Sequence, residues 1–379
     1  MRKVIMSNSI PYSEVSLGGN DIALESTSWK LVEHYIQPIK KYWLDPFVTS
    51  IAVNRYDTIF IRKNGIWEKA DVQFQSEKIL VDAITQIIRA LGQDIDKEKA
   101  PIADGRLFDG SRINAVLSPT APKGSNLTIR IFPKVRYTLE DLLSKGALNQ
   151  EMLEFLRLAV MCEYNIINSG ATGSGKTTIL NALGNLGGDE IRHGVLEDTS
   201  ELNIDKPNII YLEAPKRAIK SDDGQQIVTM ETLLETILRQ ELGSVCVGEI
   251  RNPQAATALM LALNTGHRGV KSTLHANNDK AAVRRIINML LSNDTRIPYD
   301  AVQTEIFENI DLIIQSEHTP RHGKRIVQIS EIAENEIRRL YEWDYIEGVH
   351  KRVWTGKTPT RLHSLINKYD VEMPSGLKY

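Results

Sequence analysis

The sequence has only two cysteines, few aromatic residues, almost no net charge and no long apolar run. Cys162 and Cys246 lie in apolar stretches, which favours buried reduced thiols over a disulfide or a cysteine-based metal site and indicates a reducing compartment. A net charge of -2 provides no overall attraction to nucleic acid or to an anionic membrane. The longest apolar stretch, near residues 255–263, is about half as long as a membrane span, and no secretory signal follows Met1. These absences predict a soluble, cytoplasmic protein.

Residues 170–177 read Gly-Ala-Thr-Gly-Ser-Gly-Lys-Thr, the pattern of a phosphate-binding loop. A short apolar segment at 165–168 precedes the loop and a helix-forming segment at 178–183 follows it, a context that a chance match would lack. Glycines let backbone N–H groups approach phosphate oxygens, Lys176 brings a positive charge to the β- and γ-phosphates, and the Thr177 hydroxyl suits Mg²⁺. We therefore expect binding of ATP with Mg²⁺ by Gly170, Ala171, Thr172, Gly173, Ser174, Gly175, Lys176, Thr177 and Thr178.

At 379 residues the chain is long enough for two domains. Residues 1–27 are polar and aperiodic, and are expected to form a flexible arm. Residues 28–148 are expected to form an N-terminal α/β domain with strands at 50–54, 58–62, 112–117 and 127–132 and a short helix at 137–145. Asn64-Gly65 predicts a hairpin turn, Ser76 and Gly92 bound a predicted helix, and Pro133 ends the last strand.

From residue 149 onward the pattern changes to alternating helices and buried strands. Residues 149–340 are expected to form the nucleotide-binding domain, with strands at 195–196, 209–212, 245–247, 272–274 and 312–314 and helices at 152–160, 231–239, 254–263 and 281–291. This order predicts a mostly parallel sheet covered by helices on both faces, with nucleotide at the carboxyl ends of the strands. Residues 341–379 contain several aromatic residues and are expected to pack on this domain as a hairpin and a short helix.

Two of the predicted strands end in carboxylates. Glu197 and Asp198 end one strand, and Glu249 lies at the end of another. Such carboxylates can orient an attacking water or hold Mg²⁺, although a solvated strand end would have the same sequence. His267 and His275 flank the next strand. Since no acidic or cysteine partner has zinc-ligand spacing, a histidine that hydrogen-bonds the γ-phosphate is favoured over a metal pair.

Taken singly, Arg106, Arg112, Arg130 and Arg239 have the context of surface arginines. The combination of motifs is more specific: the loop at 170–177, the acidic segment 196–202, the strand 247–251, and the histidine-containing segments 264–267 and 272–277. In this order they resemble the Walker A, Asp box, Walker B and His box of the hexameric secretion ATPases of type II and type IV secretion and pilus assembly. Segments 50–54, 104–116, 127–132 and 323–327 look like the type IV secretion and Tad-type pilus branch. The resemblance covers about residues 45–332.

The resemblance implies a C-terminal RecA-like P-loop ATPase domain and a smaller N-terminal α/β domain. It implies that Lys176 and Thr177 hold phosphate and Mg²⁺, that Glu197 polarises the attacking water, that Glu249 completes the metal shell, and that His275 responds to the γ-phosphate. It also implies that Arg112 and Arg130 reach the nucleotide across an interdomain cleft. Arg239 occupies the position at which the family has an arginine before a Pro-Asp pair, and the resemblance implies that it acts at a subunit boundary. In this sequence Glu241-Leu242 stands near the position of that pair.

The function implied is that of an ATP-hydrolysing ring, a hexamer, that drives macromolecule transfer or pilus assembly. It would work at the cytoplasmic face of the inner membrane and attach through membrane partners, without a span of its own. A RecA-like DNA translocase is an alternative, but near-neutral charge and few aromatic residues do not provide a basic track with stacking rings, so nucleic acid is not expected as a direct ligand. A nucleotide-gated scaffold without turnover is a third reading, disfavoured by Glu197 and Glu249.

Overall fold

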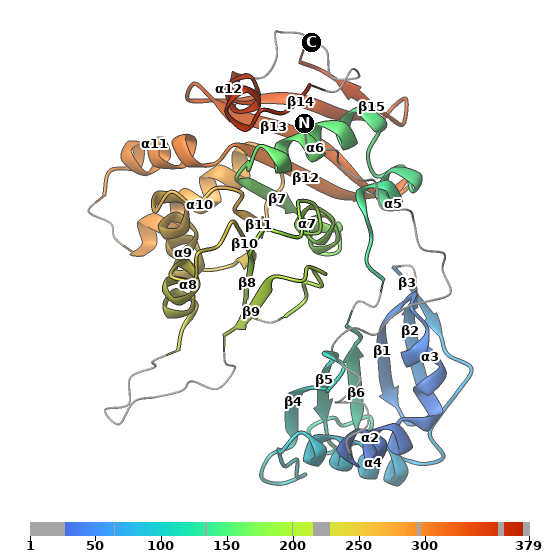
Figure 1. The fold of residues 1–379 in the computed structure, drawn as a ribbon. Helices are drawn as coiled ribbons and strands as arrows, with labels where there is room; N and C mark the ends of the chain where they lie inside the picture. The colour runs from blue at the N-terminus through green and yellow to red at the C-terminus, as the bar shows by residue number, and fades with distance from the viewer. Residues whose placement is uncertain are drawn as a thin grey trace. The chain divides into compact units, whose positions relative to one another are not determined.

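The computed structural model describes residues 27–63, 65–132, 135–198, 200–214, 228–293, 297–354 and 360–373. The chain divides between Val135 and Arg136 into two compact units, each with its own sheet and hydrophobic core (Figure 1). This confirms the predicted α/β class. The division precedes the expected boundary at residue 148, because Leu139 and Leu142 of α5 (Leu139–Ser144) pack with α6 (Gln150–Met161) in the core of the second unit.

The first unit is a six-stranded antiparallel sheet in the order β3-β2-β1-β6-β5-β4. Ser76 caps α4 by accepting the N–H of Ile79, and Gly92 follows the end of the helix, as the sequence predicts. The elements of this unit are α2 (Thr27–Tyr35), η1 (Gln37–Ile39), α3 (Lys40–Leu44), β1 (Val48–Arg55), β2 (Thr58–Lys63), β3 (Ile66–Lys69), α4 (Glu77–Ala90), β4 (Ile102–Arg106), β5 (Arg112–Val116) and β6 (Asn126–Arg130).

The register of this sheet aligns three arginines across neighbouring strands. Arg106 of β4 pairs with Arg112 of β5, and Arg112 pairs with Arg130 of β6. The adjacent residues Ile113 and Ile129 are buried in the core that α4 covers. Because successive side chains of a strand point to opposite faces, the arginines project from the other face of the sheet.

The second unit is built on a nine-stranded sheet in the order β15-β14-β13-β12-β7-β11-β10-β8-β9. Six neighbouring strands of this sheet run parallel to one another, namely β12, β7, β11, β10, β8 and β9. At the other side, β12, β13, β14 and β15 form an antiparallel meander. The strands are β7 (Ile166–Gly170), β8 (His193–Glu197), β9 (Ile209–Glu213), β10 (Ser244–Ile250), β11 (Lys271–Leu274), β12 (Leu312–Thr319), β13 (Gly323–Ala333), β14 (Glu336–Asp344) and β15 (Val349–Arg352).

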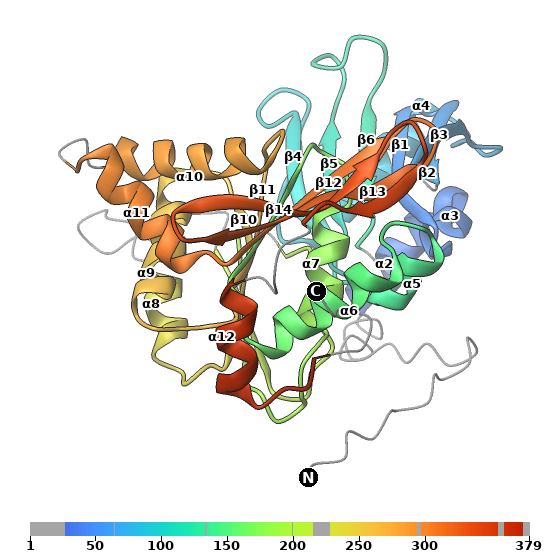
Figure 2. The same ribbon diagram turned by 90° about the horizontal axis from the view of Figure 1, so that it is seen from above.

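Helices cover both faces of this sheet (Figures 1 and 2). Neighbouring residues of β7 belong to different cores: Ile166 lies in the hydrophobic cluster with residues of α5, α6, α7 and α12, and Ile167 lies in the cluster with residues of α8, α9, α10 and α11. Both strand faces are therefore buried, which explains the continuous apolar runs. The remaining helices of this unit are α7 (Lys176–Gly184), α8 (Met230–Leu238), α9 (Pro253–Asn264), α10 (Asp279–Asn293), α11 (Tyr299–Asn309) and α12 (Thr360–Tyr369).

The sequence patterns do not predict β4, α11 or β13. The segment of β4 reads Ile-Ala-Asp-Gly-Arg, and its short mixed composition has the character of a turn. In residues 341–379, the end of β14 together with β15 forms a hairpin that extends the nine-stranded sheet at its edge, and α12 packs on one face. The predictions for Asn64 and Pro133 concern positions outside the described residues.

Among the described residues, none of the helices is both long enough and apolar enough to cross a membrane.

Candidate active site

The predicted site residues of the second unit lie at the carboxyl ends of four adjacent strands. In spatial order these strands are β7, β11, β10 and β8. The strand β7 runs into the phosphate-binding loop at Gly170, His275 follows the end of β11, Glu249 lies near the end of β10, and Glu197 ends β8. Parallel strands end at one edge of their sheet, so residues that lie far apart in the sequence meet there.

Glycine is required by the geometry of the loop. Gly170 has a φ of +154°, and a Cβ atom at this position would lie 2.3 Å from the carbonyl oxygen of Ser316. Gly175 has a φ of +104° and caps α7 without a side chain. The loop therefore presents open backbone to the amino end of α7, where N–H groups and the helix dipole favour an anion. This cradle fits a phosphate chain.

Lys176 is the first residue of α7 and is almost completely buried. Its Nζ donates to the carbonyl oxygens of Gly170 at 3.1 Å and Ala171 at 3.0 Å, and lies 3.3 Å from Nδ1 of His275. Burial lowers the pKa of Lys176, while the nearby Glu249 acts in the opposite direction. The ammonium group is thus held at the mouth of the loop, at the place where β- and γ-phosphates are expected.

A chain of polar and charged groups connects Lys176 to Arg251. Nε2 of His275 lies 3.0 Å from Oε1 of Glu249, whose other oxygen accepts from Nε of Arg251 at 2.7 Å. Arg251 also donates to Asp198 at 3.0 Å. Burial first, and then the neighbouring Lys176, lowers the pKa of His275, so the imidazole is neutral at physiological pH and can accept from Lys176 through Nδ1.

Glu197 is 3% exposed, and its carboxylate faces the backbone of the segment that follows it. Oε1 accepts the N–H groups of Glu201 at 2.8 Å and Leu202 at 3.1 Å. Burial raises the pKa of Glu197 to about 7, although these N–H groups act to lower it. A side chain at Gly248 would place its Cβ 2.8 Å from Cγ of Glu197, so glycine before Glu249 leaves room for Glu197. A carboxyl with this pKa is suited to exchange a proton near neutral pH.

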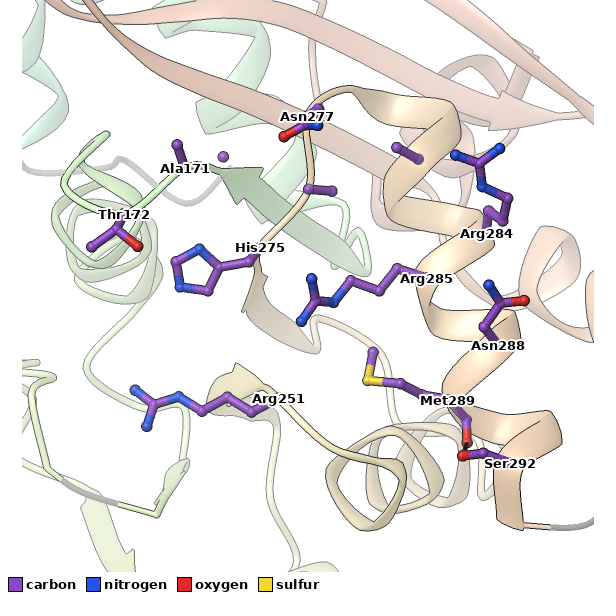
Figure 3. Close-up of a pocket in the computed structure, with 13 residues that line it drawn as sticks. Ala171, Thr172, Arg251, His275, Asn277, Arg284, Arg285, Asn288, Met289 and Ser292 are labelled. Atoms are coloured by element: carbon purple, nitrogen blue, oxygen red, sulfur yellow. Dashed lines mark hydrogen bonds between the residues drawn. The ribbon is translucent and has the colours of Figure 1, made fainter.

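A cavity of about 670 Å³ opens beside the loop and His275 (Figure 3). One wall consists of the first loop residues, from Gly170 to Thr172, and the facing wall is the polar side of α10. Thr177 and Thr178 lie in the first turn of α7. The geometry therefore brings together the predicted loop residues with Lys176, Glu249 and His275, and Glu197 lies on the same sheet edge.

The other candidate residues, three arginines and His267, belong to other segments of the chain. Arg112 and Arg130 belong to the sheet of the first unit. Arg239 is exposed at the carboxyl end of α8 and does not line the cavity. His267 contacts the Thr265 hydroxyl at 3.0 Å, and in the part of the chain that the structure describes no group of three or more His, Cys, Asp or Glu residues could hold a metal.

Sequence reasoning assigned no role to Arg251, Asn168 or Ser316. Arg251 lies two positions after Glu249, a spacing that places both side chains on one side of an extended segment. This spacing is the sequence pattern that could have indicated a role for Arg251. Nδ2 of Asn168 donates to the carbonyl oxygen of Lys176 at 2.7 Å, and the Ser316 hydroxyl contacts that of Ser174 at 3.0 Å. Contacts of this kind fix the loop against β7 and β12 and cannot be read from spacing.

Comparison with known proteins gives the family. Residues 33–337 match the model of the Type II/IV secretion system protein family. The chain is 29% identical over 327 residues to the Type IV secretion system protein VirB11 of Brucella suis biovar 1, covering 79% of this chain and 89% of that protein. It is 30% identical over 294 residues to the probable conjugal transfer protein TrbB of Sinorhizobium fredii, covering 76% of this chain and 84% of that protein.

The fold also has a counterpart among solved structures. The X-ray structure of the Legionella pneumophila ATPase DotB is similar with a TM-score of 0.53 and 21% identity, covering 88% of this chain and 87% of DotB. This likeness concerns the fold, while the family rests on the sequence matches. The matched range contains the phosphate-binding loop and all four strand ends described above. The chain belongs to the type II/IV secretion system protein family and is an ATPase of its type IV branch.

Proposed function

We propose that this ATPase works as a subunit of a homo-oligomeric ring, a hexamer, that powers macromolecule transfer or pilus assembly in a type IV secretion-type system. The observation that carries the chemistry is the meeting of Lys176, His275 and Glu249 at the loop, with distances of 3.3 and 3.0 Å between successive groups. This set provides one fixed cation, one neutral hydrogen-bonding ring and one carboxylate beside the phosphate cradle. ATP hydrolysis needs little more than positioning and charge stabilisation of this kind.

Thr177 and Glu249 are proposed to hold Mg²⁺ with the phosphates and water. The Thr177 hydroxyl, in the first turn of α7, and the Glu249 carboxylate, near the end of β10, are oxygen ligands, which Mg²⁺ prefers. Oε1 of Glu249 is buried and accepts no hydrogen bond from the described residues, since Nε2 of His275 lies 3.0 Å away without forming one, so a lone pair is left for a metal or its water. The ion would neutralise charge on the phosphates when bound.

Glu197 is proposed to take the proton of the attacking water. Its pKa of about 7 supports this role, because a general base is most effective when its pKa is near the working pH. Its hydrogen bonds to Glu201 and Leu202 would hold the carboxylate in one orientation. These contacts also require that the segment after Glu197 shift for a water to reach Oε1.

Arg112 and Arg130 are proposed to contribute positive charge to the nucleotide. Support comes from their direct pairing in adjacent strands, next to Arg106. The register places these guanidinium side chains on one face of the sheet, and guanidinium donors match phosphate oxygens. Arg239, exposed and at the end of α8, is proposed to act at a subunit boundary, where an exposed guanidinium can meet a neighbouring copy.

The protein is proposed to be cytoplasmic and to lie at the inner membrane through partner proteins of the secretion or pilus machine. This proposal rests on the family and on the names of its relatives, VirB11 and TrbB. The net charge of -2 supports attachment through partners over direct electrostatic attachment to anionic lipid.

The test is phosphate release by purified protein at saturating ATP and Mg²⁺, with Lys176→Ala as the comparison. We expect turnover by the wild type and none above background in the variant, since Lys176 is the cation that the loop places on the phosphates. Circular dichroism and size-exclusion chromatography would verify that the variant keeps its fold and its oligomeric state. Wild-type turnover in the variant would overturn the assignment of this site.

A further inference from the structure

The cavity beside His275 is lined by more positive charge than the proposed mechanism uses. Its thirteen lining residues include Arg251, Arg284 and Arg285 and no aspartate or glutamate. Arg251 is engaged with Glu249 and Asp198. Arg284 and Arg285 are exposed and make no hydrogen bond or ion pair with the residues that the structure describes. Two arginines therefore remain with unneutralised charge beside the phosphate-binding loop.

The two arginines differ in direction although they are neighbours in α10. In Figure 3 the guanidinium of Arg285 extends from the helix toward His275, whereas that of Arg284 does not. In agreement with this view, Arg285 contributes to lowering the pKa of His275, after burial and Lys176. Arg285 therefore lies on the His275 side of the cavity, whose lining also includes the first residues of the loop.

The helix that carries Arg285 is firmly held. Its opposite side, including Ile286 and Ile287, is buried in the core of the second unit. At its start, Asp279 accepts hydrogen bonds from Gln328 and from the Ser330 hydroxyl of β13, the latter at 2.9 Å. Only residues 275–278 separate α10 from β11. The backbone of Arg285 is thus fixed relative to His275, and its long side chain can reach a ligand without movement of the helix.

We propose that Arg285 binds the terminal phosphoryl group of ATP from the α10 side of the cavity, opposite Lys176. The first loop residues, which line the same cavity, lie where the end of a phosphate chain is expected, because the amino end of α7 holds its inner part and Lys176 is expected at the β- and γ-phosphates. A guanidinium suits this ligand because its planar donors match phosphate oxygens. Arg285 would then distinguish ATP from ADP within one chain. This inference rests on the proposed function of the site.

The test compares nucleotide affinities of the full chain, measured by calorimetry with ADP and with a non-hydrolysable ATP analogue, both with Mg²⁺. For Arg285→Ala we expect the affinity for the ATP analogue to fall roughly 10-fold, the scale of one charge-assisted hydrogen bond, and that for ADP to change less than about 2-fold. Turnover should fall at least as much. Arg285→Lys should recover part of the loss, since it retains the charge without the fork.

Arg284→Ala is the matched control, because it removes an equal charge from the same helix and cavity. It should leave the ratio of the two affinities within about 2-fold of the wild type. The inference would be overturned if Arg285→Ala also kept this ratio, or if both variants changed it equally, which would indicate only the overall charge of the helix. If the wild type itself bound neither nucleotide, the proposed function would fail instead, so the two failures can be told apart.

Discussion

The two units bring charged side chains together in opposite ways. In the first unit, Arg106, Arg112 and Arg130 become neighbours because antiparallel strands that are close in sequence pair in register. In the second unit, Lys176, Glu249 and His275 meet because parallel strands separated by long crossovers end at one edge of a sheet. In an antiparallel sheet the local register decides which side chains are neighbours, and here it places like charges side by side on one face of the sheet. A parallel edge collects different functional groups around one point, which suits catalysis.

After Lys176, the parallel edge should be most sensitive at Gly170. The substitution Gly170→Ala would place a Cβ 2.3 Å from the carbonyl oxygen of Ser316. The loop must shift to avoid this contact, and we expect turnover to fall by about 10²-fold or more, since small misplacements at a reacting centre have effects of this size. Phosphate release would measure it.

Gly92→Ala is the control, because Gly92 has a φ of +70° with no atom within 4 Å of the added Cβ. It should cost about 1 kcal/mol of stability and leave turnover nearly unchanged. Equal losses of turnover in both variants would show that general destabilisation, and not the loop, is responsible.

The two carboxylates of the parallel edge should separate binding from chemistry. Glu197→Gln keeps the side-chain shape, so nucleotide should still bind while turnover falls by roughly 10²-fold, the usual scale for a general base. Glu249→Gln should lower turnover and also raise the Mg²⁺ concentration needed for half-maximal activity. Binding of a fluorescent nucleotide and a Mg²⁺ titration of turnover would measure these effects. Normal turnover in both variants would mean that the carboxylates only stabilise the fold.

The arginine row of the first unit should have a smaller effect. For Arg112→Ala and Arg130→Ala we expect turnover to fall on the order of 10-fold, because each removes one positive charge while the loop stays intact. Thr128→Ala is a suitable control, since Thr128 is an exposed residue of the same strand as Arg130. If the arginine variants keep the turnover of Thr128→Ala, the first unit takes no part in the chemistry.

The last comparison concerns the pH dependence that Glu197 gives to stability and turnover. Burial raises its pKa from 4.5 to about 7, so between these pH values the folded protein holds this proton more often than the unfolded chain. The free energy of unfolding should therefore decline as pH rises from about 4.5 to 7 and level off above 7. Glu197→Gln should flatten this decline, which denaturant unfolding across this range can measure. The turnover of the wild type should rise through the same pKa, because a general base must be deprotonated.

The sequence alone determined much of this protein. Eight consecutive residues, from Gly170 to Thr177, combine glycines, a lysine and a hydroxyl whose chemistry is local, and apolar runs such as that of β10 predict buried parallel strands. The helix between Ser76 and Gly92 could be predicted equally well, because its cap and its periodic apolar positions lie within one element. Information of this kind is contained in a short window of residues.

Tertiary structure alone decided how these pieces combine. The burial that raises the pKa of Glu197, the space that Gly248 leaves for it, and the contact of Lys176 with His275 all depend on which strands are neighbours in the sheet. The same is true of Arg285, whose sequence context is that of any solvated helix. Strand order and helix packing are set by long-range burial of apolar surface, so no local pattern could specify these distances.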